Sequence, residues 1–311
     1  MNNEKATNSM TDDAGNNRLM SRRELGKALS RTGLALAASA LAAKVGLAAD
    51  GAPAPLAPAT TPDSMAHGMH MDHDMTDYGI PAGPPQQVAM LVYPEMTALD
   101  LIGPNQVLAG LMNINVHLVW KDRSLITTDT GIPIQPTMTF KDCPNALTVL
   151  FVPGGSRGTV ALMDDPAVLD FLAHQGQTAR YVTSVCTGAL VLGAAGLLKG
   201  YRATSHWAFR DLLPLMGATL APGRVVEDRS RITGGGVTAG IDFGLHLAAK
   251  LRNEKYAKAM QLGLEYDPQP PYHAGTPAGA GADITQMLRA LYEPTWDGAQ
   301  AAAVRAQKRL S

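Results

Sequence analysis

The sequence predicts an α/β protein built on a mostly parallel sheet with helices on both faces. From residue 86 onward, short apolar runs alternate with longer helix-like runs. Strands that are apolar throughout are typical of parallel sheets covered on both sides. Hydrophobic residues make up 46% of the 311-residue chain, which is enough for a full core. The part of the chain that follows the first 80 residues suits one domain, or a domain with an added tail.

Six short apolar runs are expected to be strands, at 88–93, 116–120, 147–152, 180–185, 225–226 and 231–233. Four longer runs are expected to be helices, at 97–111, 165–175, 189–198 and 237–251. Pro104 should bend the first helix, because proline lacks the N–H that continues the ladder. Pro166 suits the first position of the second helix. Open sheets of this class hold their sites at the carboxyl ends of strands, where residues 153–156 and 184–188 fall.

The pentapeptide Ser184-Val185-Cys186-Thr187-Gly188 has the layout of a nucleophile elbow between a strand and a helix. The turn is tight, so the residues two before and two after the nucleophile must be small, as Ser184 and Gly188 are. Cys186 would then lie at a helix N-terminus, where unpaired N–H groups favour the thiolate. The alternative is a buried, inert cysteine at a strand end.

A cysteine nucleophile needs a proton partner and oxyanion donors. Asp100 is the leading partner, because it is an isolated charge between apolar neighbours; burial near Cys186 would raise its pKa and let it hold a proton. The alternative for Asp100 is a helix cap. The backbone N–H groups of Gly155 and Thr187 are candidate oxyanion donors. His206 is a candidate supporting residue or a structural histidine.

Two further features have both a structural and a functional interpretation. Cys143 and Cys186 are the two cysteines of the chain, and in an oxidising compartment such a pair often forms a disulfide. The run 234–236 consists of three glycines and opens a helix. It lacks the residues of a phosphate loop, so we interpret it as a tight turn rather than an anion site.

Residues 1–49 are interpreted as a twin-arginine signal peptide. The motif Ser21-Arg22-Arg23-Glu24-Leu25-Gly26-Lys27 precedes a mild apolar stretch at 32–43, and small residues for cleavage lie near Ala48. The alternative is a chance amphipathic helix. Export by the twin-arginine machinery would place the folded protein in the periplasm or outside the cell. No apolar run reaches 18 residues, so no stable membrane span is expected.

Residues 50–85 form a predicted disordered linker rich in Pro, Ala, Met and His. Thioether and imidazole groups suit copper, so a part of the linker is a candidate for weak copper binding. The alternative is a disordered spacer of biased composition. The candidate copper ligands are Met65, His67, Met69, His70, Met71, His73 and Met75. The formal net charge of −1 gives no sign of nucleic-acid binding.

Several segments together resemble the ThiJ/PfpI superfamily, and within it most closely the isonitrile hydratase branch. They are Tyr93-Pro94 and residues 97–104, 151–155, 184–200, 203–207, 235–242 and 264–271. The resemblance spans about residues 86–275. It implies a flavodoxin-like, doubly wound fold of the glutamine amidotransferase type and a homodimer. The cysteine segment alone also fits the amidase-like sensor domains of AraC-type regulators.

The resemblance implies roles for three residues: Cys186 as nucleophile, Asp100 as conserved acid and Thr187 as the threonine after the nucleophile. The peptidase-like branch has histidine at position 187, and the glyoxalase-like branch usually has glutamate at position 100, so both fit less well. The export signal and the Met/His linker depart from the branch. These two departures put in question which small molecule is the physiological substrate of this protein.

The predicted organisation is therefore an α/β domain at 86–273 and a linker with a C-terminal helical tail at 274–311. The predicted function is cysteine-dependent hydration of isonitriles to N-substituted formamides, with no required cofactor. The alternatives are a ligand sensor, or a protein of periplasmic stress, aldehyde or copper handling. A sensor of the regulator type carries a DNA-binding domain after this fold, and residues 274–311 are too short for one.

Overall fold

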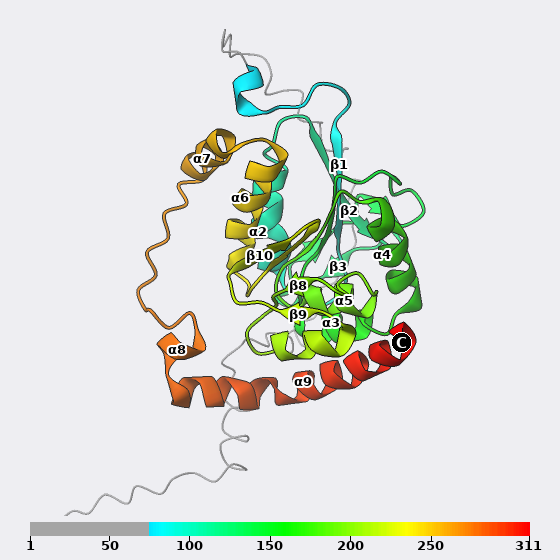
Figure 1. Ribbon diagram of the computed structural model, residues 1–311, viewed down its shortest axis with the longest axis vertical. Helices are drawn as coiled ribbons and strands as arrows, with labels where there is room; N and C mark the ends of the chain where they lie inside the picture. Colours follow the sequence, from blue (N-terminus) through cyan, green and yellow to red (C-terminus); the bar gives the residue numbers. More distant parts are fainter. Residues whose placement is uncertain (1–74) are drawn as a thin grey trace, which may run out of the picture. The chain divides into compact units, whose positions relative to one another are not determined.

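The computed structural model describes residues 75–311, and its centre is a seven-stranded sheet in the order β10-β11-β7-β6-β1-β2-β5 (Figure 1). All neighbours pair in parallel except β10 and β11. The strands are β1 (Gln86–Leu91), β2 (Ile114–Trp120), β5 (Met138–Thr139), β6 (Val149–Val152), β7 (Tyr181–Ser184), β10 (Val225–Asp228) and β11 (Arg231–Gly234). The predicted α/β class and the mostly parallel sheet are confirmed.

Helices cover the sheet on both sides, with α2 and α6 packed together on one side and α3, α4 and α5 on the other (Figure 1). The helices are α2 (Ala98–Leu108), α3 (Ser156–Leu162), α4 (Pro166–Thr178), α5 (Gly188–Ala194), α6 (Ala239–Leu251), α7 (Glu254–Gly263), α8 (Pro277–Ala280) and α9 (Ala282–Leu310). Two 3₁₀ helices are η2 (Met75–Tyr78) and η3 (Arg210–Met216). In the part of the chain that the structure describes, no helix is long and apolar enough to cross a membrane.

The predicted elements are present, with changes at their ends. α2 contains Pro104 but stops at Leu108 rather than at 111. α5 stops at Ala194 rather than at 198, because Gly196 follows with a φ of 76°, which a helix cannot contain. The sequence reasoning missed α3, which follows the glycines after β6 and has seven residues.

A small antiparallel pair, β3 (Ile126–Thr127) and β4 (Pro133–Ile134), holds the start of α2. Asp129, in the turn between them, accepts a hydrogen bond from the Ala98 N–H at 3.1 Å. Thr97 occupies the N-cap position but makes no side-chain cap bond. The cap of α2 therefore comes from a residue about 30 positions away, and Asp100 is not the cap.

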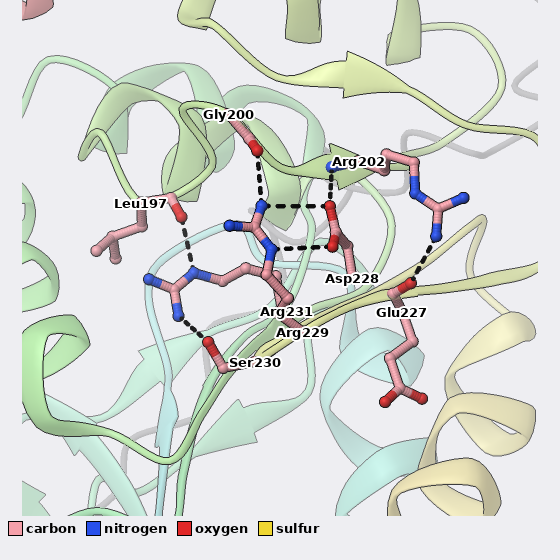
Figure 2. Close-up of polar contacts among 8 residues, drawn as sticks. All are labelled: Leu197, Gly200, Arg202, Glu227, Asp228, Arg229, Ser230 and Arg231. Carbon is pink, nitrogen blue, oxygen red and sulfur yellow. Dashed lines mark hydrogen bonds and ion pairs between the residues drawn. The ribbon is translucent and has the colours of Figure 1, made fainter.

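Three arginines, Arg202, Arg229 and Arg231, join the hairpin β10–β11 to the short pair β8 (Arg202–Ala203) and β9 (Thr219–Leu220) (Figure 2). Arg229 donates to Asp228 and to the Gly200 carbonyl, and Arg231 donates to the Leu197 carbonyl at 2.8 Å. Both guanidinium groups also lie over the Tyr201 ring. These contacts fix the amino end of β11.

The C-terminal helix α9 packs against α3, α5 and η3. Its inner face is formed by small side chains that are fully buried or nearly so: Ala299, Ala302, Ala303 and Ala306. Arg305 donates to both carboxylate oxygens of Asp164, at 3.1 and 3.2 Å, and lowers the pKa of that carboxyl. The segment predicted as a linker and helical tail therefore contains a long helix, which packs against the helices on one side of the sheet.

Candidate active site

Four adjacent strands, in the order β11-β7-β6-β1, bring their carboxyl ends to one place. The segment after β1 leads into α2, which carries Asp100, and β6 is followed by Gly154. Cys186 follows β7, and Gly235 follows β11. Parallel strands in one sheet all end at the same edge, so residues from four distant segments meet there.

Cys186 occupies the predicted sharp turn between β7 and α5. Its φ is 54°, in the left-handed region that residues other than glycine rarely adopt. Two hydrogen bonds hold it there: its N–H donates to the Gly235 carbonyl at 2.6 Å, and Ser205 Oγ donates to the Cys186 carbonyl at 2.8 Å. Strain of this kind persists where the surroundings impose it, and it is concentrated at functional sites.

The small residues of the elbow are required by close backbone approach. A Cβ atom at Gly188 would collide with the Val152 carbonyl oxygen and lie 2.7 Å from the Pro153 carbonyl oxygen. Ser184, on the other side of the turn, is completely buried. The local spacing that identified the elbow in the sequence therefore reflects packing against the end of β6.

Asp100 and Cys186 meet across Gly154. Asp100 is completely buried, and its Oδ2 accepts a hydrogen bond from the Gly154 N–H at 3.0 Å. A Cβ atom at Gly154 would lie 2.5 Å from that oxygen and 2.7 Å from Cys186 Cβ. Asp100 Oδ1 makes no hydrogen bond that meets ordinary geometric limits within residues 75–311. One carboxylate oxygen is thus held by the backbone and the other is available for a proton.

Burial shifts both groups toward their neutral forms. Loss of solvent raises the pKa of Asp100 to about 7, against the opposing effects of the Cys186 thiol and the Gly154 N–H. Burial, followed by the charge of Asp100, raises the pKa of Cys186 well above its ordinary value, although the Thr187 N–H acts in the opposite direction. The thiolate that a helix N-terminus alone would favour is therefore opposed by desolvation. The resting pair retains at least one proton at neutral pH.

Thr187 belongs to a buried chain of hydroxyl groups. Its Oγ1 accepts from the Gly155 N–H at 3.0 Å and lies 2.8 Å from Thr159 Oγ1. Tyr93 continues the chain, with its hydroxyl 3.2 Å from Thr159 Oγ1 and donating to the Pro153 carbonyl at 2.8 Å. The Gly155 N–H, a predicted oxyanion donor, is engaged by Thr187 and would have to exchange partners to meet an oxyanion. The Thr187 N–H faces the Cys186 sulfur.

His206 lies beside the elbow, among aromatic rings. Its Nδ1 accepts from the Ala208 N–H at 3.3 Å, and burial lowers its pKa to about 4, so the ring is neutral at pH 7. A Cβ atom at Gly236 would be 3.3 Å from His206 Cδ2. The ring contacts Tyr292 of α9 edge to face, with centroids 5.8 Å apart. This environment fits an uncharged wall of the site better than a proton carrier.

Both cysteines are free, so no disulfide joins Cys143 to Cys186. Burial raises the pKa of Cys143 to about 11, as it raises that of Cys186, but no carboxyl contributes to the shift at Cys143. Within residues 75–311 no cluster of three or more His, Cys, Asp or Glu side chains is arranged to hold a metal. Of the candidate copper ligands, Met65, His67, Met69, His70, Met71 and His73 lie outside the described residues, as does the predicted signal peptide. The chain enters the described part at Met75, the first residue of η2.

Sequence reasoning identified Cys186, Asp100 and Thr187 but missed much of their support. Gly154 and Ser205 lay inside segments that carry the family resemblance, but no local signal in the sequence connects either residue with Cys186. Tyr93 also lay in a quoted segment, but nothing local connects it with Thr159. Tyr292 lies in a segment that had no recognised motif.

The sheet, the elbow and the acid–thiol pair define a class: an α/β protein with a cysteine at a nucleophile elbow. Residues 86–250 match the DJ-1/PfpI family. This match covers more than half of the chain, and the chain therefore belongs to the DJ-1/PfpI family. The expected ThiJ/PfpI membership is confirmed.

Three relatives show how far the similarity extends. An isonitrile hydratase from Pseudomonas putida is 51% identical over 209 residues, which are 67% of this chain and 91% of that protein. The crystal structure of a ThiJ/PfpI family protein from Pseudomonas syringae is 48% identical, has a TM-score of 0.73, and covers 76% of this chain and 98% of its own. The transcriptional regulator GbdR of Pseudomonas aeruginosa is 27% identical over 194 residues, or 51% of its length.

Proposed function

We propose that this protein is an isonitrile hydratase, which converts an isonitrile and water to an N-substituted formamide. The 51% identity to the Pseudomonas putida isonitrile hydratase supports the reaction class. The mechanism rests on one observation: the Asp100 carboxyl and Cys186 lie close to each other, with Gly154 beside both. No cofactor enters the proposed reaction.

In the first step, Cys186 attacks the terminal carbon of the isonitrile. The active form of the pair carries one proton, with Asp100 as carboxylate and Cys186 as thiol. As the S–C bond forms, Asp100 takes the thiol proton and passes it to the same carbon, which gives a thioimidate. Proton transfer by a positioned group of this kind is worth roughly 10²–10⁴ in rate.

In the second step, water adds to the thioimidate carbon. Asp100 accepts a proton from the water as the C–O bond forms and passes it to the nitrogen; as the hydroxyl becomes the formyl oxygen, Asp100 carries the hydroxyl proton to the departing sulfur. The C–S bond then breaks, which returns the Cys186 thiol and releases the formamide. Thr187 supports this step through its N–H beside the sulfur and its hydroxyl on Gly155. The balance is one isonitrile and one water consumed for each formamide.

The test is turnover of cyclohexyl or phenyl isonitrile by reduced protein, with formamide measured by chromatography. Cys186→Ala should lose turnover entirely while it keeps its fold, since alanine occupies less space at the same turn. Cys143→Ala is the matched control and should keep full activity. Hydratase activity retained in Cys186→Ala would refute the mechanism. No turnover in the native protein would refute the function and favour aldehyde substrates or a ligand sensor.

We further propose that the protein is exported by the twin-arginine route and works in the periplasm or outside the cell. The motif at 21–27 and the apolar stretch after it support this proposal. Cell fractionation of the native chain beside the double variant Arg22→Lys, Arg23→Lys tests this. Export that is unaffected by the substitutions would contradict it.

Two proposals concern assembly and metal. A homodimer is proposed from the family, and equilibrium sedimentation of the mature protein tests it; a monomer at all concentrations would contradict it. Weak copper binding is proposed for the Met/His segment of the linker, on its composition. Copper titration with and without residues 60–78 tests it, and equal binding by both forms would contradict it.

A further inference from the structure

The helix α9 lies after the segment that matches the family, but one part of it reaches the elbow. Tyr292 of α9 packs with His206 and Phe209, with ring centroids 5.8 and 5.9 Å apart. Next to His206 in the chain is Ser205, whose hydroxyl donates to the Cys186 carbonyl. Burial, followed by the charge of Cys186, raises the pKa of the Tyr292 phenol.

Tyr292 also lines a cavity of about 110 Å³ together with Ala208, Arg289 and Trp296. For comparison, an engineered apolar cavity of about 150 Å³ in another protein binds benzene. Two of the four walls are aromatic rings, and a third is a guanidinium group, which stacks on aromatic faces. Arg289 already lies over the Trp207 ring, 5.5 Å from its centroid. The chemistry of these walls suits a flat or compact apolar group.

Cys186 itself lines neither this cavity nor the smaller one next to Trp207. The link between the cavity and the elbow is the ring of Tyr292, which lines the cavity and packs against His206. An isonitrile has a linear C–N≡C axis, with the reactive carbon at one end and the substituent at the other. Tyr292, which belongs both to the cavity and to the aromatic group beside Cys186, is the residue that such a substituent would meet.

We propose that the substituent of the isonitrile binds in the cavity under α9, and that Tyr292 is the residue that determines which substituents are accepted. The inference rests on the proposed hydratase function. Tyr292 contacts the substituent and not the reacting carbon, so substitution of Tyr292 changes KM rather than kcat. For isonitriles with small substituents that do not reach the Tyr292 ring, KM does not depend on Tyr292.

The experiment compares phenyl isonitrile with methyl isonitrile in the native protein and in Tyr292→Ala. We expect KM for phenyl isonitrile to rise about 10-fold, which is typical for loss of an apolar contact in a specificity pocket. KM for methyl isonitrile should change less than about 2-fold, and kcat should be kept for both substrates. Tyr292→Phe keeps the ring and should behave as the native protein does. Leu291→Ala, an exposed neighbour on the same helix, is the control for changes to α9.

A second measurement separates this inference from the hydratase function. In a Cys186→Ala background, which cannot turn over, calorimetry reports the affinity for phenyl isonitrile and for N-phenylformamide. Binding that weakens about 10-fold in Tyr292→Ala, but not in Tyr292→Phe, supports the pocket even when no isonitrile is hydrated by the native protein. Equal effects of Tyr292→Ala on both substrates, or unchanged binding of both phenyl compounds, would overturn the proposal.

Discussion

At the scale of single residues, desolvation governs the pair formed by Asp100 and Cys186. A carboxyl that is completely buried beside a thiol keeps its proton to much higher pH than in water, since the charged form has lost its solvent. The same burial would make a permanent thiolate costly. The site therefore combines a buried acid that can exchange a proton near neutral pH with a thiol that is neutral at rest; in the proposed mechanism this thiol is the nucleophile.

The raised pKa of Asp100 has a consequence for stability that Asp100→Asn tests. The folded state keeps the proton up to about pH 7, whereas an unfolded aspartate loses it near 3.8. The contribution of Asp100 is therefore fully present below pH 3.8 and is lost as the pH rises to about 7, by about 4 kcal/mol. We expect the free energy of unfolding of the native protein to fall relative to Asp100→Asn across this window. Urea unfolding at pH 4, 5.5, 7 and 8 measures the difference.

The comparison with the variant is needed because His206 titrates in the opposite sense. Its folded pKa of about 4 lies below the ordinary 6.5, so its neutral form stabilises the fold above pH 6.5 and the benefit is lost as the pH falls to about 4. The effect of His206 on the free energy of unfolding is the same in the native protein and in Asp100→Asn, so it cancels when the two are subtracted. Parallel pH profiles for the native protein and Asp100→Asn would show that the carboxyl titrates normally.

At the scale of elements, the junction of β7 and α5 is set by the approach of two backbones. Gly188→Ala would place a methyl group against the Val152 and Pro153 carbonyls, which are backbone atoms and have no freedom to rotate away. We expect a loss of about 3 kcal/mol or more in the free energy of unfolding, the upper range for overpacking. Activity should fall as well, because the elbow positions Cys186.

The matched control for this substitution is Gly263→Ala at the end of α7. A Cβ atom there meets nothing within 4 Å, and the backbone has no positive φ. Alanine should be neutral or should stabilise α7 by about 0.5–1 kcal/mol, because it restricts the unfolded chain. Chemical denaturation of the two variants side by side tests both expectations. A mild effect at Gly188 would mean that the turn is looser than its contacts indicate.

At the scale of the molecule, α9 completes the layer of helices that contains the elbow. Its alanines allow the helix to lie close to α3 and α5, and Arg305 fixes its far half to Asp164. A helix that looks like an appendage in the sequence therefore covers the side of the domain on which α5 begins at Gly188. The same helix carries Tyr292 to the neighbourhood of Cys186.

Ala303→Leu tests this close packing. Ala303 is fully buried, and three extra carbons would force the helix away from its partners, at a cost of about 1–3 kcal/mol. Ala301→Leu puts the same group on the exposed face of α9 and should change stability by no more than about 0.5 kcal/mol. Thermal and urea unfolding measure both. Equal effects would contradict an intramolecular packing role for α9.

Much of the fold was predictable because it depends on local patterns. Apolar runs of strand length predicted every strand of the central sheet except the two-residue edge strand β5, and the spacing of small residues around Cys186 identified the elbow. Asp100 was recognisable as an isolated charge in an apolar helix. These signals lie within a few residues of each other, and the preferences of each residue and its neighbours are enough to produce them.

The rest depended on segments that are far apart in the chain. The cap of α2 comes from Asp129, and the hydroxyl chain joins Tyr93, Thr159 and Thr187. Local preference contains no information on such pairs. The short α3 was missed for a related reason, since seven residues with a glycine among them carry little helical signal and the packing against α5 and α9 stabilises the turn.

The sequence by itself determined the α/β class, the positions of the main strands along the chain, and Cys186 and Asp100 as the candidate cysteine and acid of the site. Only the tertiary structure decided their chemistry. Whether Asp100 holds a proton, whether Gly155 is a free donor and whether His206 is charged depend on burial and on partners from other strands. Solvent exclusion and hydrogen-bond partnership are properties of the packed molecule, because they arise where distant segments meet.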